Sequence, residues 1–588
     1  MLYIRAILTA CFLCFFTFFS VQGQPKFINQ LELTDTSKTD ESSWSNEGLA
    51  LKVAFGSTDV RYLRNRVPEE IYNNDLKITA WKGERVNLQL VIWSNRNSYS
   101  INVYPSDLLA PNKVITSDAV KAFPVRYVMT DSFLQGCGER KNDTISQSLT
   151  PDMLVNPGAF SISGKSTRPV WVTIDVPSDA KPALYKGYFE IQAKGRFKKR
   201  LNYTLEVQDR ILPKPSEWQF HLDLGQQPWA VSRTSSVKQW SNEHWEALGA
   251  MLKKLADAGQ KCITTTLIHN PWGEQTFDPC ESMIEWLKST DGSWTYDFTL
   301  FDRWVSFAMS CGITQQIDCY SMIPLHNSFR YLDENDNEYK VLYAAPGTIE
   351  FEKHWRPFIL AFREHLLNKG WLDKTCITIN ERELKAMLSI SNLIKATAPE
   401  FKLSFDGDYY TDIAMVTYDL SLAIDKLPDN FNFKKRDDLN LPTSFNVDCS
   451  GPEHPNTFTF SPLAENTLMG WYAMAAGFNG FHRWAYNNWG VNAEQDSRYK
   501  SGPAGDTFMV YPGAMSSIRF ERLREGIQDY EKIRILKAVF KKEGTEAANQ
   551  KLERITAMLK PFTFSAITAD NASFLVNRGK EILNELSR

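Results

Sequence analysis

An amide and a carboxylate stand side by side at Asn380 and Glu381, directly after the β-branched run 375–379. The residues that follow, 384–390, carry apolar side chains at helical spacing. This pattern predicts a buried strand that delivers two polar groups at its C-terminal end, where parallel α/β barrels keep their chemistry. The alternative is a helix start, in which Asn380 caps the helix and Glu381 interacts with its positive end.

Further polar and aromatic residues follow other strand-like runs, and they would share one mouth if the strands form a barrel. The predicted set comprises Asp223, His269, Asn270, Trp272, Tyr320, Asp406, Asp408, Asp448, Trp484, Tyr486, Asn487 and, on a nearby loop, Asp506. Carboxylates, amides and aromatic rings together suit a polyhydroxylated ligand. Each residue also has a purely structural interpretation: Asp223 and Asp448 as caps, His269 as a buried core histidine, Trp484 as barrel packing and Asp506 as a turn former.

Several other chemistries are disfavoured by what the sequence lacks. Three histidines at ligand spacing are missing, which argues against a catalytic metal. There is neither a glycine-rich phosphate loop nor a Gly-x-Ser-x-Gly elbow. We therefore expect no cofactor.

The elements that must position these residues alternate between strands and helices over residues 217–540. Eight strand-like runs lie near 218–224, 262–268, 313–319, 375–379, 402–405, 420–424, 443–447 and 480–485. Alternating units of this kind predict a (β/α)₈ barrel of the TIM type. No clear helix separates the sixth and seventh runs. Residues 541–588 are helical in pattern and are expected to pack on the barrel as an extension.

Residues 25–212 have a different pattern, with short runs in which apolar and polar residues alternate, as in 86–92, 170–176 and 201–207. Turn residues separate these runs, which predicts an N-terminal β-sandwich domain. Pro213 and Pro215 favour an extended linker to the next domain.

The composition agrees with a multi-domain globular protein, since 588 residues exceed one ordinary core. A net charge of −3 and no long basic run make nucleic acid an unsuitable partner. The 17 tryptophans mildly favour a carbohydrate ligand, because an indole offers a flat apolar face and an N–H donor. The oligomeric state is left open.

Residues 1–23 have the pattern of a secretory signal peptide, with Arg5, an apolar run over 6–19 and a small-residue cleavage site at 21–23. We expect an exported protein, periplasmic or extracellular. A lipid anchor at Cys11 is less favoured, because the apolar run follows this cysteine instead of preceding it. No other apolar stretch is long enough to predict a transmembrane segment.

Seven cysteines lie beyond the signal, an odd number at wide spacing and with no Cys-x-x-Cys pair. This argues against a zinc site or a disulfide-dense scaffold. Several are expected to be small core residues.

Four segments together resemble glycoside hydrolase family 123, the β-N-acetylgalactosaminidases. They are 269–276 (HNPWGEQT), 291–294 (DGSW), 301–304 (FDRW) and 379–382 (INER). The segments 503–506 (PAGD) and 517–531 (SIRFERLREGIQDYE) are similar to hallmarks of its catalytic domain. The second of these is the most specific, and we interpret it as a structural helix whose Arg and Glu side chains pair.

The resemblance implies a retaining glycosidase in which the 2-acetamido group of the substrate attacks its own anomeric carbon to form an oxazoline intermediate. Glu381 then matches the general acid/base, and Asn380 stands where the family has an aspartate, so it would orient the acetamido group. The sugar pocket would comprise His269, Trp272, Tyr320, Asp408, Trp484, Tyr486 and Asp506. The substrate would be a glycan or glycolipid with terminal N-acetylgalactosamine.

Two other functions stay open. Neutral Asn380 could mark a non-catalytic or weakened glycan-binding relative. Alternatively, Glu381 could work with Asp406 or Asp408 in an ordinary two-carboxylate glycosidase. Adjacent strand residues point to opposite sides, so the pair at 380–381 fits substrate assistance better than a protein nucleophile.

Overall fold

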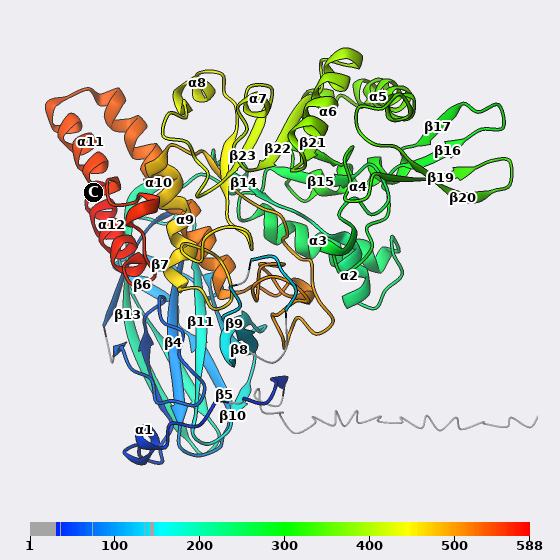
Figure 1. Cartoon of the computed structure of the whole chain (residues 1–588). Coiled ribbons are helices and arrows are strands. Elements are labelled where there is room, and N and C mark those ends of the chain that lie inside the picture. The colour runs from blue at the N-terminus through cyan, green and yellow to red at the C-terminus, as the bar shows by residue number, and fades with distance from the viewer. Residues whose placement is uncertain (1–30, 36, 73–74, 135, 141–145) are drawn as a thin grey trace, which may run out of the picture.

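The computed structural model describes residues 31–35, 37–72, 75–134, 136–140 and 146–588. They form two main parts, a mostly β N-terminal domain and a barrel domain with a helical tail, which lie against one another in Figure 1. The predicted signal peptide, residues 1–23, lies outside the described residues.

The N-terminal β domain has two sheets that share a hydrophobic core. In β4, Val86, Leu88, Leu90 and Ile92 all belong to this core, as the alternation of the sequence predicts. One sheet has the order β2-β1-β4-β11-β8-β9, and the other β10-β5-β12-β13-β3 with β6 and β7 at its side. The domain's elements are α1 (Glu41–Ser45), β1 (Lys52–Gly56), β2 (Ile71–Tyr72), β3 (Leu76–Lys82), β4 (Arg85–Ser94), β5 (Ser98–Pro105), β6 (Leu108–Ala110), β7 (Lys113–Ile115), β8 (Val120–Asp131), β9 (Gln147–Leu154), β10 (Phe160–Ile162), β11 (Ser166–Asp175), β12 (Ala183–Ala193) and β13 (Phe197–Ile211).

The second domain contains a nearly closed barrel of eight strands, in the order β14-β25-β24-β23-β22-β21-β18-β15. All paired neighbours are parallel, and β14 meets β15 through the single bridge Leu222–Gln260. The strands lie at the eight positions predicted from the sequence. They are β14 (His221–Leu224), β15 (Cys262–Thr266), β18 (Gln316–Tyr320), β21 (Thr375–Asn380), β22 (Lys402–Gly407), β23 (Asp419–Ala423), β24 (Thr443–Asn446) and β25 (Gly480–Arg483).

Helices connect the barrel strands, and the short α8 occupies the place where the sequence shows no clear helix. The longest connecting helix, α5, begins at Thr348, whose hydroxyl accepts the N–H of Phe351, and ends at the left-handed Gly370. These helices are α2 (Pro228–Thr234), α3 (Asn242–Ala256), α4 (Thr299–Ser310), α5 (Ile349–Lys369), α6 (Leu384–Thr397), α7 (Thr411–Ala414), α8 (Phe433–Asp438) and α9 (Leu463–Ala476).

A small four-stranded sheet extends to one side of the barrel in Figure 1 and was not predicted. It consists of two hairpins inserted after β15 and β18. They are β16 (Glu285–Lys288) with β17 (Trp294–Asp297), and β19 (Ser328–Asp333) with β20 (Glu338–Tyr343).

The helical tail comprises α10 (Ile518–Glu543), α11 (Glu546–Leu559) and α12 (Ala572–Leu586). The predicted domain limit at residue 540 falls inside α10. Helices α9 and α10 approach closely at Gly470 and Gly526, since a Cβ atom at Gly470 would lie 2.0 Å from the Gly526 carbonyl oxygen. Helix α12 packs on α9, where Gly579 leaves room for the ring of Trp471.

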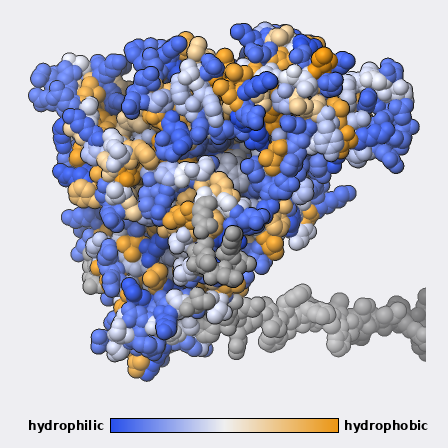
Figure 2. Space-filling view, viewed as in Figure 1, coloured by the Kyte–Doolittle hydropathy of each residue, from blue (hydrophilic) through white to orange (hydrophobic). Residues whose placement is uncertain are grey.

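On the face of the molecule seen in Figure 2, hydrophilic residues predominate and hydrophobic ones are scattered among them. Among the described residues, no helix combines the length and apolar character needed to cross a membrane.

Helix α10 also joins the two domains through buried ion pairs. Arg519 is fully buried and donates to Asp152 of β9 over 3.0 Å, and to the carbonyl oxygens of Thr457, Gly505 and Phe508. Lys532 pairs with Glu84 over 2.9 Å. Arg519 of the segment 517–531 and Lys532 directly after it thus hold the domain interface, because a buried charge is stable only when paired.

Replacing Arg519 by Met should lower the free energy of unfolding by about 3–5 kcal/mol, since Asp152 would keep a buried charge without its main partner. Denaturant or thermal unfolding measures the change. The control is Arg578→Met, which removes an exposed pair with Glu581 and should cost less than about 1 kcal/mol. A wild-type midpoint for Arg519→Met would contradict this role.

Candidate active site

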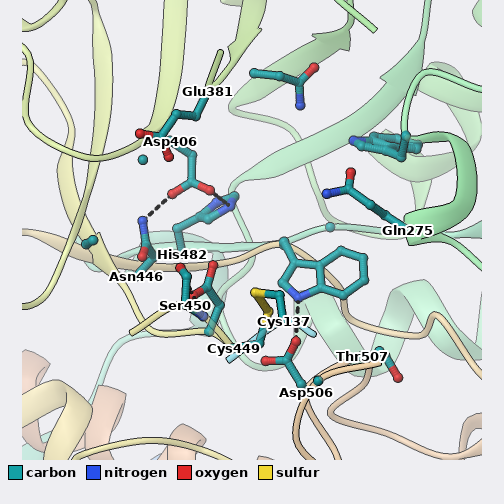
Figure 3. A pocket seen from close by; sticks show the side chains of 18 of the residues that line it. Cys137, Gln275, Glu381, Asp406, Asn446, Cys449, Ser450, His482, Asp506 and Thr507 are labelled. Atoms are coloured by element: carbon teal, nitrogen blue, oxygen red, sulfur yellow. Dashed lines mark hydrogen bonds and ion pairs between the residues drawn. A yellow bond between two sulfur atoms is a disulfide. The ribbon is translucent and has the colours of Figure 1, made fainter. Parts of the chain in front are cut away.

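The C-terminal ends of the barrel strands surround a cavity of about 410 Å³. Seven of the eight strands contribute a side chain to its lining, among them Asn380 from β21, Asp406 from β22, Asn446 from β24 and His482 from β25. Figure 3 shows the labelled side chains pointing into this space. The volume lies within the range of about 300–1,000 Å³ that small-molecule sites occupy.

The carboxyl group of Glu381 is half-buried at the edge of this cavity. Its Oε1 accepts a hydrogen bond from the Tyr410 hydroxyl at 3.1 Å and from the Asp408 N–H at 3.3 Å. Burial raises the pKa of Glu381 above its usual value; the charges of Asp408 and Asp406 add to the rise, and the two hydrogen bonds oppose it. The group is therefore suited to hold a proton and release it.

Gly407 makes room for Glu381. A Cβ atom at this position would lie 2.7 Å from Oε2 and 2.8 Å from Cδ of Glu381. The backbone at Gly407 also has φ +151°, which side chains rarely adopt. The glutamate thus extends across the end of β22, over the backbone of a residue without a side chain.

Asn380 and Asp406 are directly paired in the parallel register of β21 and β22. Asp406 Oδ2 lies 3.3 Å from His482 Nε2, and Oδ1 accepts a hydrogen bond from Asn446. The other ring nitrogen of His482 lies 3.0 Å from Asp223 Oδ2. Figure 3 shows Asp406 between Asn446 and His482, with Glu381 beside it.

Opposite charges stabilise the row of side chains formed by Asp223, His482 and Asp406. Burial alone would raise the pKa of Asp406, but the charge of His482 and hydrogen bonds from His482, Ser421 and Asn446 lower it. Burial opposes the charge on His482 as well, yet Asp406 and Asp223 raise its pKa well above the usual value. Asp406 is thus an ionised carboxylate and His482 an imidazolium.

Aromatic side chains form other parts of the cavity wall. The Trp484 indole N–H donates to Asp506 Oδ2 over 3.1 Å, and Arg483 pairs with Oδ1 of the same carboxylate at 2.9 Å. Burial raises the pKa of Asp506 to about 6, with a further rise from Asp448 and a lowering by Arg483. Trp272 and Tyr320 also line the cavity, and their rings pack with the centroids 5.1 Å apart.

The N-terminal β domain completes the wall. Cys137, from the connection between β8 and β9, forms a disulfide with Cys449, which follows β24, and both residues line the cavity. Arg140 donates to the carbonyl oxygens of Tyr499 and Gly502, which lie on the loop that leads to Asp506. The disulfide between Cys137 and Cys449 was not predicted, because the two cysteines are 312 residues apart in the sequence. Cys262, Cys280, Cys319 and Cys376 are buried thiols, as expected.

The structure brings seven of the nine predicted site residues to the cavity. They are Trp272, Tyr320, Asn380, Glu381, Asp408, Trp484 and Asp506. Asp406 and Asp448, also candidates, line it too.

The other two predicted site residues do not line the cavity, and these placements are corrected. Tyr486 is only 1% exposed; its ring packs against Phe520 and its hydroxyl lies 3.4 Å from the Met251 carbonyl oxygen. His269 turns toward the inserted hairpins, where its Nδ1 lies 3.1 Å from Glu281.

Sequence reasoning missed His482 and Asn446. Alternation along the strands could have found them, because every second residue of a barrel strand faces the interior. In β25 the polar His482 lies between Phe481 and Arg483, and in β24 Asn446 follows Phe445. Tyr410 and Cys137 lie on loops, where no such period exists.

Family models match both domains. The model described as glycoside hydrolase 123, catalytic domain, matches residues 225–536, and that of the glycoside hydrolase 123 N-terminal domain matches residues 55–193. The chain belongs to glycoside hydrolase family 123. This family 123 protein is therefore a glycosidase, with Glu381 and its neighbours at the mouth of the barrel.

Solved structures agree in fold. A family 123 glycoside hydrolase from Clostridium perfringens, described in connection with glycolipid glycan hydrolysis, has a TM-score of 0.81 at 24% identity and covers 91% of this chain and 97% of its own. A family 39 glycoside hydrolase from Bacteroides cellulosilyticus WH2 reaches only 0.32 at 11% identity, covering 78% and 82%, so it says nothing about this site. No curated protein matches the sequence.

Gly407→Ala should lower kcat/KM by about 10²-fold, since the new methyl group must displace the Glu381 carboxyl group and small misplacements of catalytic groups are costly. Steady-state kinetics measures the loss. In the control, Gly451→Ala, the added Cβ meets only ordinary contacts of 3.6 Å and longer. Wild-type kinetics in Gly407→Ala would show that Glu381 need not occupy its present position.

Proposed function

We propose that this family 123 glycosidase releases terminal β-linked N-acetylgalactosamine from glycans or glycolipids with retention of configuration. The acetamido group of the substrate serves as the nucleophile, and a protonated oxazoline (oxazolinium) intermediate forms. The observation that carries the proposal is the neighbouring pair Asn380 and Glu381, which opens into one cavity together with Trp484 and Asp506.

Glu381 is the general acid/base in this proposal. In the first step the acetamido carbonyl oxygen bonds to the anomeric carbon, the glycosidic bond breaks, and the Glu381 proton moves to the leaving oxygen. In the second step Glu381 takes a proton from water, whose oxygen bonds to the anomeric carbon as the ring of the intermediate opens. The raised pKa of Glu381 favours the protonated form that the first step needs.

Asn380 orients the acetamido group. Its Oδ1 is buried and has no hydrogen-bond partner within the described part of the chain, although the residue lines the cavity. A buried carbonyl oxygen without a donor is unfavourable, so the N–H of a bound acetamido group would stabilise it. Trp484, Trp272 and Tyr320 offer ring faces to the sugar, and Asp408 and Asp506 offer acceptors to its hydroxyls.

Similarity and the size of the cavity support the proposed substrate class. The Clostridium relative is described with glycolipid glycan hydrolysis, and a cavity of about 410 Å³ suits a terminal sugar. Export is also proposed, since residues 1–23 have the pattern of a signal peptide and disulfides such as Cys137–Cys449 persist in oxidising compartments.

The finer fold class belongs to the same proposal. We assign the nearly closed parallel barrel to the (β/α)₈ TIM type, because helices lie between its strands and its polar groups gather at the strands' C-terminal ends. The two N-terminal sheets with their shared core are assigned to a β-sandwich.

Glu381→Gln should lower kcat/KM for an aryl β-N-acetylgalactosaminide by about 10²–10⁴-fold, because the amide cannot transfer a proton. The matched control is Glu383→Gln, an exposed position two residues further on, which should keep wild-type rates. Equal rates in wild type and Glu381→Gln would reject the assignment.

A second substrate separates the proposal from a two-carboxylate mechanism with Asp406 or Asp408. An aryl β-galactoside without the acetamido group should not be hydrolysed at a significant rate. Comparable rates on both sugars would instead favour a protein nucleophile.

The pH dependence of kcat/KM should reflect the protonation of Glu381. A general acid works only when protonated, so kcat/KM should be full below the Glu381 pKa and fall as pH rises through it, above the usual value for glutamate. Tyr410→Phe removes a hydrogen bond that favours the ionised form and should move this alkaline limb to higher pH. Tyr409→Phe, its neighbour, should leave the limb in place. A limb that Tyr410→Phe does not move would point to another group, such as Asp506.

A further inference from the structure

The proposed reaction places positive charge on the sugar. Neither Glu381 nor Asn380 supplies a fixed negative charge to balance it. Glu381 enters the first step protonated, and the amide of Asn380 is neutral. As the glycosidic bond breaks, charge builds on the anomeric carbon and on the acetamido nitrogen. An anion fixed near these atoms would stabilise the transition state more than the bound substrate.

Asp406 occupies the position where such an anion is needed. It is the register partner of Asn380 on the next strand, and partners in a parallel sheet direct their side chains to the same face. Its side chain is buried on the barrel side and keeps 30% of its surface exposed, and the residue lines the cavity. Glu381, the first residue after β21, lies instead over Gly407.

Asp406 is held from two directions. His482 Nε2 lies 3.3 Å from its Oδ2, and Asn446 donates to Oδ1. His482 is in turn fixed by Asp223 at 3.0 Å, and Asp223 accepts a hydrogen bond from Gln260 at 3.1 Å. Because both ring nitrogens of His482 face carboxylates, the ring donates at both and is an imidazolium. The row of two carboxylates and one imidazolium therefore carries a net negative charge.

Two other aspartates at the cavity, Asp448 and Asp506, have different surroundings. Asp448 accepts hydrogen bonds from Ser450 and Gly451 of its own loop. Asp506 is held by Trp484 and Arg483, so its charge is matched within the wall. Asp406 alone among these three is fixed by side chains of two further barrel strands, β24 and β25.

We propose that Asp406 is a catalytic residue whose carboxylate stabilises the positive charge that develops on the sugar and its acetamido group, with His482 and Asn446 as positioning residues. This rests on the proposed substrate-assisted function. The acetamido oxygen forms its bond to the anomeric carbon as the bond to the leaving oxygen breaks, and the proton of Glu381 moves to that oxygen. The acetamido N–H stays intact and donates to Asn380 Oδ1, and Asp406 forms no bond to carbon.

Asp406→Asn tests the charge while it keeps the shape. We expect kcat for an aryl β-N-acetylgalactosaminide to fall by about 10²–10³-fold, with KM changed by less than about threefold, because the charge matters in the transition state. The affinity for a thiazoline analogue of the bicyclic intermediate should fall by about 10²-fold in calorimetry, and that for free N-acetylgalactosamine should not. The control is Asp412→Asn, an exposed aspartate on α7.

Wild-type kcat and analogue affinity in Asp406→Asn would overturn the inference. A different outcome would reject the proposed function itself: the wild-type protein would then bind the thiazoline analogue no more tightly than it binds free N-acetylgalactosamine. If circular dichroism shows that Asp406→Asn is unfolded, the variant Asn446→Ala tests the role of Asp406 instead. This variant removes one hydrogen bond to Asp406, so kcat and analogue affinity should fall by about fivefold, and unchanged values would likewise overturn the inference.

Discussion

A buried charge must be neutralised by a neighbour, and the interior of this barrel is arranged around that requirement. Below the cavity, His221 lies 2.9 Å from Asp419, and Gln316 donates to Asp318 over 2.9 Å. Burial, together with the charges of Asp223 and Asp419, raises the pKa of Asp318 to about 8, so this group stays protonated at neutral pH. These side chains come from three different strands, β14, β18 and β23, and their pairing fixes how these strands are placed around the barrel.

The same requirement governs the boundary between the domains. Helix α10 is buried along much of its length although its sequence is rich in Arg and Glu, because these side chains find partners in the N-terminal β domain. Glu531 accepts the N–H groups of Gln219 and Phe220, where the chain enters the barrel. A helix with no clear apolar face can therefore be a core element when its charges are matched.

Much of this arrangement could be predicted from the sequence, because it depends on local pattern. All eight barrel strands fall in runs that the sequence marks as strand-like, and Asn380, Glu381 and Asp406 were found because they stand at the ends of two of these runs. The sequence carries no comparable signal for the direction in which a side chain on a loop points. Tyr486 resembles Trp484 in the sequence, but its backbone N–H bonds to the Gly225 carbonyl oxygen and its ring turns into the core. His269 is drawn toward Glu281 in an insertion that the alternating pattern did not reveal.

The disulfide between Cys137 and Cys449 has a consequence for how modular this enzyme is. Glycosidases are often treated as an autonomous catalytic unit with exchangeable accessory units, yet here part of the substrate chamber is supplied by the accessory unit. Excising the barrel, or grafting it onto a different partner, would leave the loop around Gly502 without Arg140 and the chamber without one side. An intact chamber therefore requires both domains.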